Sequence, residues 1–153
     1  MPKQWIEDAE EIAAFLARAR VGRLGLCREG QPYVVPVSFV FAEGKLYFHC
    51  GPRGRKLDCL RANPRVCFEV DELEGLRLGE SACNHSLRYT SVIAQGRACL
   101  LTDPAQKERA LRWLLAKYTP GDAAAPFPPP QLARVEVVEI TIEEMTAKRN
   151  VES

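Results

Sequence analysis

An apolar strand pattern runs into a basic turn at Tyr47-Phe48-His49-Cys50-Gly51-Pro52-Arg53-Gly54-Arg55-Lys56-Leu57. The apolar run ends at Gly51-Pro52, a dipeptide that interrupts regular structure, and a helical pattern begins after Gly54. Backbone N–H groups at the start of a helix, next to Arg and Lys side chains, form a binding site for a phosphate or another dianion. The same residues also fit a solvated basic turn, so the flanking segments have to decide between the two.

Strand patterns dominate the chain before this turn. Val21–Cys27, Tyr33–Phe41 and Leu46–Cys50 are rich in apolar and β-branched residues and are separated by short loops that contain glycine. Such spacing predicts an antiparallel meander. Pro36 lies inside the second strand, where it cannot donate to a ladder, so it predicts a sheet edge or a bulge.

The chain after the turn continues with strands, one irregular segment and a polar end. Arg65–Val70, Tyr89–Leu101 and Leu132–Ile142 are predicted strands, and Gly96 in the middle one predicts a bulge or a close backbone approach. The segment 71–88 has mixed polarity and is expected to be an irregular loop or a flap over a ligand. The polar end, residues 143–153, is expected outside the sheet.

Three helices are predicted around these strands. An acidic first turn and an i, i+3, i+4, i+7 apolar stripe place one over Ala9–Ala19. Arg55–Ala62 forms a short helix that Asn63-Pro64 ends. Asp103 caps a third helix that begins at Pro104 and reaches Tyr118. About six strands joined by hairpins, with two substantial helices, predict a mainly β fold: an antiparallel barrel with flanking helices.

Composition sets the broad class of the protein. Residues 1–153 are expected to form a single domain with a real core, since hydrophobic residues make up 46% and charged residues 27% of the chain. The formal net charge of +1 does not favour a nucleic-acid partner. No apolar run approaches the roughly 20 residues of a membrane span, and the start of the chain lacks the apolar core of a signal peptide. We therefore expect a cytoplasmic protein that has no membrane or nucleic-acid partner.

Cysteine and histidine positions argue against a zinc or thiol site. No Cys-x-x-Cys pair occurs, only His49 and His85 could complete a ligand set, and most of the cysteines are expected to be buried free thiols. His49 and Cys50 are neighbours on a strand, so their side chains should point to opposite faces and cannot act as a base and its nucleophile. The six cysteines are Cys27, Cys50, Cys59, Cys67, Cys83 and Cys99.

The order of several segments resembles one known family. Tyr47-Phe48-His49, then Gly54-Arg55-Lys56-Leu57, then Leu60-Arg61-Ala62-Asn63-Pro64-Arg65-Val66 look like the FMN-binding split β-barrel of the pyridoxamine 5′-phosphate oxidase superfamily. Tyr89–Ala98, followed by Asp103-Pro104 and its helix, also fits. The resemblance covers about Ala9 to Lys148. It is closest to the flavin-nucleotide-binding branch that includes Nim-type nitroimidazole-resistance proteins, and it implies an antiparallel, Greek-key-like barrel.

The resemblance also implies a cofactor and its contacts. In the family, FMN lies at a homodimer interface, and an Arg-Lys pair after the third strand, here Arg55 and Lys56, holds its phosphate. His49 matches a histidine that faces the flavin in Nim-type relatives and is the candidate catalytic residue, although a strand-end histidine bonded to the backbone is the alternative. The remaining expected flavin contacts are Val35, Pro36, Val37, Ser38, Tyr47, Phe48, Cys50, Arg88 and Ser91.

The implied function is an FMN-binding oxidoreductase that reduces a small organic acceptor, such as a nitro-aromatic compound, with electrons from NADH or NADPH. The end Thr146-Ala147-Lys148-Arg149-Asn150 lacks the Arg-x-His arrangement of true pyridoxamine-phosphate oxidases, so vitamin B6 oxidation is not expected. FAD or a deazaflavin stays open as the cofactor. Two other functions also stay open: a haem-binding split barrel with His49 or His85 as axial ligand, and a flavin binder without catalysis.

Overall fold

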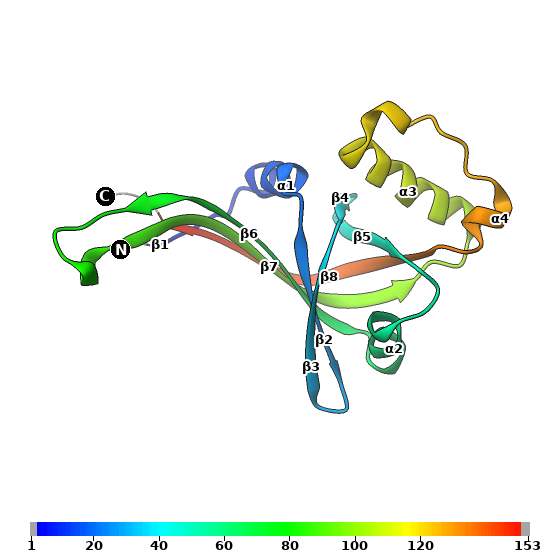
Figure 1. The fold of residues 1–153 in the computed structure, drawn as a ribbon, viewed down its shortest axis with the longest axis horizontal. Helices are drawn as coiled ribbons and strands as arrows, with labels where there is room; N and C mark the ends of the chain where they lie inside the picture. The colour runs from blue at the N-terminus through cyan, green and yellow to red at the C-terminus, as the bar shows by residue number, and fades with distance from the viewer. Residues whose placement is uncertain (1–2, 151–153) are drawn as a thin grey trace.

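The computed structural model describes residues 3–150, and its centre is one antiparallel sheet that curls into a barrel without closing (Figure 1). The strand order is β3-β2-β6-β7-β8-β5-β4, with β1 added beside β8. β3 and β4 follow each other in the chain yet occupy opposite ends of this order, which is the split. The predicted mainly β split barrel is therefore confirmed. The strands are β1 Lys3–Trp5, β2 Gly22–Arg28, β3 Gln31–Val37, β4 Val40–Ala42, β5 Lys45–Cys50, β6 Arg65–Arg77, β7 Ser86–Leu100 and β8 Glu136–Asn150.

The helices form where their capping signals predict them. Asp8 accepts a hydrogen bond from the N–H of Glu10 at the start of α1, and Asp103 accepts one from Ala105 at the start of α3. The short helix α2 has the predicted bounds. No helix among residues 3–150 is long and apolar enough to cross a membrane. The helices are α1 Ala9–Arg18, α2 Arg55–Ala62, α3 Pro104–Tyr118 and α4 Pro129–Leu132, with 3-10 turns η1 Ala82–Asn84 and η2 Pro120–Asp122.

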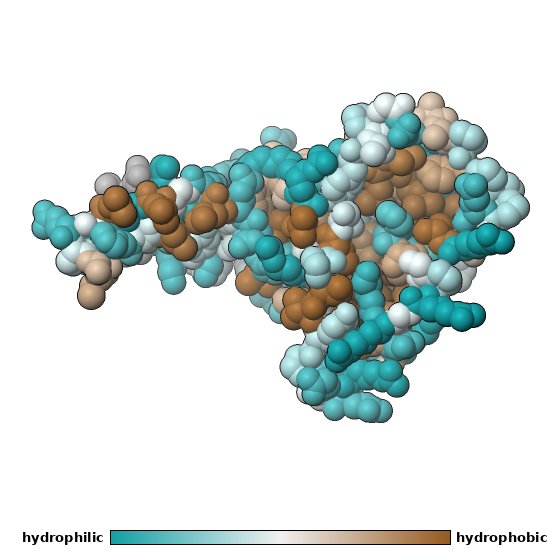
Figure 2. All heavy atoms as spheres, viewed as in Figure 1, coloured by the Kyte–Doolittle hydropathy of each residue, from teal (hydrophilic) through white to brown (hydrophobic). Residues whose placement is uncertain are grey.

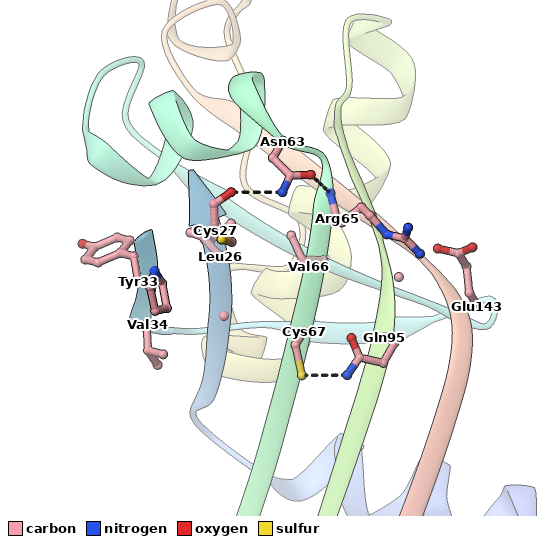
Figure 3. A pocket seen from close by; sticks show the side chains of 13 residues that line it. Leu26, Cys27, Tyr33, Val34, Asn63, Arg65, Val66, Cys67, Gln95 and Glu143 are labelled. Atoms are coloured by element: carbon pink, nitrogen blue, oxygen red, sulfur yellow. Dashed lines mark hydrogen bonds between the residues drawn. The ribbon is translucent and has the colours of Figure 1, made fainter. Parts of the chain in front are cut away.

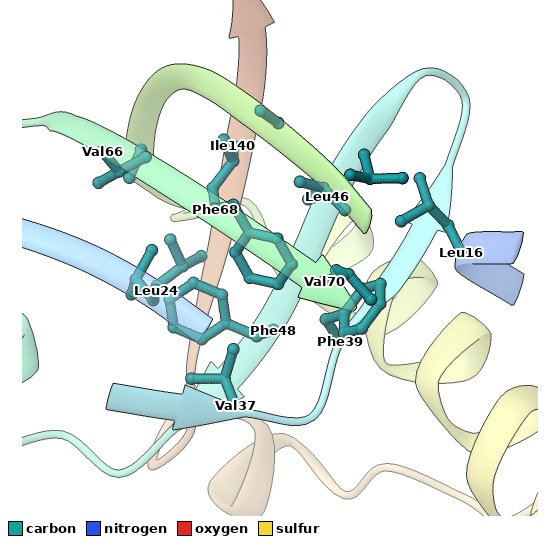
Figure 4. Packing of buried hydrophobic residues seen from close by; sticks show 14 of the residues in the cluster. Leu16, Leu24, Val37, Phe39, Leu46, Phe48, Val66, Phe68, Val70 and Ile140 are labelled. Carbon is teal, nitrogen blue, oxygen red and sulfur yellow. The ribbon is translucent and has the colours of Figure 1, made fainter. Parts of the chain in front are cut away.

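Two hydrophobic clusters lie on opposite faces of β5. The larger fills the barrel around Phe39, Phe48 and Phe68, each at most 1% exposed (Figure 4). The smaller joins Tyr47 and Val137 to the apolar stripe of α3. Side chains alternate across a strand, so β5 contributes Phe48 to one cluster and Tyr47 to the other. This double burial holds β5, and with it His49, in a fixed position.

A long arm replaces the predicted irregular loop over 71–88. β6 continues to Arg77 and β7 begins at Ser86, so the two strands form an extended hairpin (Figure 1). The expected flap is wrong for most of its length. Leucines remain exposed on the arm, so its sequence lacks the alternating polarity of a half-buried strand. A bulge between Leu73 and Gly75 also shifts the register.

The expectation for the polar chain end is also wrong as far as Asn150. β8 runs through 143–150 and pairs with both β7 and β1, so the sheet has eight strands where about six were predicted. Its backbone groups are satisfied on two sides, which stabilises a strand whose side chains carry no apolar pattern. β1 spans three residues, too few for a periodic signal. Residues 151–153 lie outside the described part.

The predicted second strand is broken in two. β3 ends at Val37 and β4 starts at Val40, with Ser38 and Phe39 between them. Pro36 lies in β3, which pairs only with β2, so the predicted sheet edge is confirmed. Both expectations for Gly96 hold: the register shifts beside it, and a Cβ there would stand 2.2 Å from the carbonyl oxygen of Thr141.

The cysteines are free but less buried than predicted. Only Cys59 is buried, whereas Cys83 and Cys99 are exposed and the others are intermediate. Cys67 accepts a hydrogen bond from Gln95, 3.4 Å from Nε2 to Sγ. No group of three or more His, Cys, Asp or Glu side chains within residues 3–150 is arranged to hold a metal ion.

Candidate functional site

The N-terminus of α2 contacts β3 on one side of the split and β5 on the other. The guanidinium carbon of Arg55 lies 4.2 Å from the ring centroid of Tyr33 on β3. Lys56 Nζ lies 5.5 Å from the ring centroid of Phe48 on β5. Two consecutive cations thus contact one aromatic ring of the edge strand β3 and one of β5, the neighbour of the edge strand β4, and cation–π attraction holds them there.

These two cations are available to an anion. No carboxylate of residues 3–150 lies within 4.0 Å of Arg55 or Lys56. Gly54 caps α2 with a φ of 140°, a conformation that disfavours side chains, and makes no side-chain cap hydrogen bond. The first N–H groups of α2 consequently have no side-chain acceptor at the cap, and they add to the positive potential of the helix end. This donor set suits a phosphate dianion.

The other end of the split opens into a pocket of about 490 Å³. Ser38, from the break between β3 and β4, and His49, from β5, both line it. Most of the wall is apolar and comes from α3, α4 and the segment between them. A pocket of this size and lining suits a flat organic ring with a few polar contacts. The other lining residues are Leu111, Leu114, Leu115, Tyr118, Thr119, Phe127, Gln131, Leu132 and Val135.

His49 lines this pocket and is exposed to solvent. Burial lowers its pKa below the ordinary 6.5, and the positive charge of Lys56 lowers it further. It faces the pocket on the α3 side, whereas Cys50 packs against the main core, so the predicted opposite orientation of the two is confirmed. A neutral imidazole offers one hydrogen-bond donor and one acceptor to a ligand.

Tyr118 holds the backbone of Phe39, the residue after Ser38, a role that the sequence did not reveal. Its hydroxyl accepts from the N–H of Phe39 at 3.0 Å and lies 2.8 Å from the carbonyl oxygen of Arg20 and 3.0 Å from that of Phe39, to which it can donate. The sequence pattern placed Tyr118 in the apolar stripe of α3. Phe39 and Tyr118 lie 79 positions apart in the sequence, so no local pattern could indicate this hydrogen bond.

The other expected flavin contacts, on β3 and β5, differ in how far their side chains are exposed. Val37 and Phe48 are buried in the main core, so contact with a cofactor could come only from their backbone. Pro36 is exposed and Val35 partly buried. Tyr47 faces α3 and donates to Glu139 at 3.0 Å, and burial, reinforced by Glu139, raises its pKa to about 12.

Arg88 and Ser91 lie on the arm, away from α2. Arg97 of β7 pairs with Arg65, near α2. At roughly 3.3 Å per residue, Ser91 lies about 20 Å from Arg97 along β7. Arg88 is farther still. The structure therefore does not bring these two residues to Arg55 within one chain. His85 lies beyond them at the arm tip, where its Nδ1 accepts from the N–H of Gly79 at 3.0 Å.

Comparison with known proteins gives one family. The sequence model of the family described as pyridoxamine 5′-phosphate oxidase matches residues 8–149. Among solved structures, a candidate 5-nitroimidazole antibiotic resistance protein from Bacteroides thetaiotaomicron is 30% identical, with a TM-score of 0.81 over 97% of this chain and 87% of that one. An FAD-binding protein from Mesorhizobium loti is 31% identical, with a TM-score of 0.69 over 99% and 100%. A flavocytochrome from Azotobacter vinelandii is 27% identical, with a TM-score of 0.86 over 97% and 70%.

We expect NMR titration of the ring protons to give His49 a pKa below 6.5, because burial disfavours the cation. In Lys56→Gln that pKa should rise yet stay below 6.5, since burial is the larger cause. Arg61→Gln, which removes another cation of α2, serves as the control. The imidazole of His49 takes up a proton more readily in the unfolded chain than in the folded one. The contribution of His49 to the free energy of unfolding is therefore lost as the pH falls below 6.5. A pKa of 6.5 or higher in the unmodified protein would contradict this assignment.

Proposed function

The chain belongs to the pyridoxamine 5′-phosphate oxidase family, and from that premise we propose that it is a homodimeric, FMN-binding oxidoreductase. It reduces a small organic acceptor, such as a nitro-aromatic compound, with electrons from NADH or NADPH. Relatives that are named as FAD-binding, as a flavocytochrome and as a candidate nitroimidazole resistance protein support this proposal.

The observation that carries the proposal is the pair of cations at the start of α2, which no carboxylate of residues 3–150 pairs. A phosphate dianion at the start of α2 can take a bidentate contact from Arg55, a point charge from Lys56 and backbone N–H groups. From Tyr33 to Ser38 the extended chain measures about 17 Å. That length suits FMN, with its phosphate at Arg55 and its ring near Ser38.

The pocket at the far end suits the reacting partner. Flavin supplies hydride and electron transfer, and the protein supplies binding, orientation and electrostatics. The apolar wall from α3 and α4 excludes water and accepts a flat aromatic molecule. His49 can donate a hydrogen bond to an oxygen or nitrogen of that molecule and so orient it, because its imidazole stays neutral near pH 7.

The arm provides the reason for a dimer. Its leucines are strongly exposed, from 46% for Leu87 to 77% for Leu78, and they lie together on the extended hairpin (Figure 2). Contiguous exposed apolar surface of this kind is typical of an interface. In this proposal Arg88 and Ser91 reach the flavin of the second protomer, since they lie too far from Arg55 of their own chain.

Arg55→Ala and Lys56→Ala should each weaken FMN binding about 10- to 100-fold, because a hydrogen bond to a charged group contributes about 1.5–3 kcal/mol. Titration calorimetry with flavin-free protein measures the change. Arg53→Ala, in the same turn but without a ring contact to β3 or β5, should bind FMN as the unmodified protein does. An unchanged FMN affinity in both variants would place the phosphate elsewhere.

Leu76→Glu should convert the dimer to a monomer, because it puts a charge into an apolar interface. Sedimentation equilibrium checks the mass, and FMN affinity should fall with it. Ala124→Glu adds the same charge at an exposed position outside the arm and should leave the dimer intact. A dimer that persists in Leu76→Glu would exclude the arm as the interface.

The flavin-loaded protein should oxidise NADH or NADPH when a nitro-aromatic or quinone acceptor is present. His49→Gln should lower kcat while leaving FMN affinity within about threefold, because Gln keeps a donor but not the shape of the ring. Bound flavin without turnover on any nitro, quinone or azo acceptor would leave a flavin binder without catalysis. A Soret band in the protein purified from cells would favour the haem alternative.

A further inference from the structure

One wall of the pocket beside His49 comes from residues 119–135, the segment that leads from α3 to β8 (Figure 1). Residues 123–128 of this segment form no helix or strand. Pro126 precedes Phe127 and three prolines follow it. A proline has no backbone N–H to donate, so four residues around Phe127 cannot contribute to a backbone ladder. The position of Phe127 in the wall therefore depends on side-chain contacts.

Arg112 of α3 makes these contacts. Its Nη1 donates to the carbonyl oxygens of Ala123 and Ala125, at 3.0 Å each, and its guanidinium carbon lies 4.9 Å from the ring centroid of Phe127. Its Nη2 donates to the carboxylate of Glu108, one turn earlier on α3, at 2.8 Å. This charge-assisted bond orients the guanidinium, and the planar fork of an arginine permits all of these contacts at once.

Phe127 connects Arg112 to the pocket. The side chain of Phe127 lines the pocket and its ring carries the guanidinium of Arg112, whereas Arg112 itself does not line the pocket. Leu111, which precedes Arg112 on α3, and Leu115, about one turn after it, line the pocket directly. The helix thus presents leucines to the pocket and its cation to the 119–135 segment. Arg112 therefore acts on a ligand of this pocket through the wall that it holds.

The pocket offers no full charge to a ligand. Its lining within residues 3–150 includes no Asp, Glu, Lys or Arg, and desolvation holds the pKa of His49 below 6.5. The pocket on the outer face of β2, β6 and β7 differs, because Arg65 and Glu143 are among its lining residues (Figure 3). A charged group in the pocket of His49 would lose hydration without gaining a partner. The hydroxyl of Ser38 and the amide of Gln131 can instead bond to neutral polar groups.

We propose that Arg112 is a specificity-determining residue of this pocket: it holds Phe127 in the wall, and the pocket that results takes an uncharged, flat aromatic acceptor such as a nitrobenzene or a quinone. The inference rests on the proposed oxidoreductase function and names the class of its acceptor. Arg112 is a positioning residue, because it acts through Phe127. Without Arg112 the ligand would have to order the 119–135 segment on binding, and this ordering reduces affinity.

The test is calorimetric titration of the oxidised, FMN-loaded protein with nitrobenzene and, separately, with 4-nitrobenzoate, both without a nicotinamide donor. Nitrobenzene should bind at least about tenfold more tightly, because the carboxylate of 4-nitrobenzoate meets no cation in the lining. Arg112→Ala should weaken nitrobenzene binding about tenfold, the equivalent of one charge-assisted hydrogen bond. Arg112→Lys should recover only part of this loss, since it keeps the charge but not the fork. With NADH or NADPH present, KM for nitrobenzene should rise about tenfold in Arg112→Ala while kcat stays within about threefold.

Arg109→Ala is the matched control. Arg109 lies on the same helix, pairs with Glu43 at 3.2 Å and lies 4.9 Å from the ring centroid of Trp113, but none of these residues lines the pocket. Nitrobenzene should bind this variant as it binds the unmodified protein, and FMN affinity within about twofold of normal shows that each variant is folded.

Three results would overturn this inference alone while FMN still binds: no preference for nitrobenzene over 4-nitrobenzoate, unchanged nitrobenzene affinity in Arg112→Ala, or an equal loss in Arg109→Ala. The expected affinities without turnover would support the role of Arg112 and contradict the proposed reductase activity. Binding of neither FMN nor nitrobenzene to the unmodified protein would overturn the proposed function and this inference with it.

Discussion

The hydroxyl of Tyr118 holds the backbone of Phe39 at the break between β3 and β4, where the barrel splits. It bonds to both the N–H and the carbonyl of Phe39, so the chain leaves β3 and enters β4 without pairing the two strands. The ring of Phe39 is meanwhile fully buried and packs edge-to-face on Phe68, with centroids 5.1 Å apart. Backbone and side chain are thus anchored from opposite directions.

The last turn of α3 extends this anchor to the N-terminal helix. Lys117 donates to the carbonyl oxygen of Leu16 at 3.1 Å, and its ammonium lies 3.8 Å from the ring centroid of Phe39. Burial, with a smaller effect from Arg20, lowers its pKa to about 8. One helix end therefore organises α1, the strand break and the wall of the pocket that contains Ser38 and His49.

Charges are distributed differently at the site and on the arm. Arg23 pairs with Glu69 and Asp71, and Arg18 with Glu72, but these exposed pairs each contribute at most about 1 kcal/mol. The arm therefore depends mainly on backbone pairing and, in the proposed dimer, on its leucines. Arg55 and Lys56 instead rest on aromatic rings and keep their charge for a ligand. This difference separates cations that stabilise the fold from cations that can bind.

Local sequence patterns predicted the helices and the turn before α2 well. Capping side chains, Pro104 and Asn63-Pro64 act within a few residues, so α1, α2 and α3 follow from the chain itself. The anion site at Gly54-Arg55-Lys56 follows from the same local pattern and stays a prediction. The arm was not predicted because its exposed side carries leucines, so its sequence lacks the alternating pattern of a strand. The end of β8 was not predicted because its side chains carry no apolar pattern and its partner strands lie far away in the sequence.

The sequence by itself determined the three longer helices, where α2 begins and which cations stand at its start. Only the tertiary structure decided which strand each cation contacts, that Tyr118 bonds to the backbone between β3 and β4, and that Arg88 and Ser91 lie on a separate arm. The physical reason is the distance along the sequence over which each interaction acts. Capping and helix propensity act between neighbours, whereas the position of Tyr118 against Phe39 and of Arg55 on Tyr33 depends on the packing of the whole barrel.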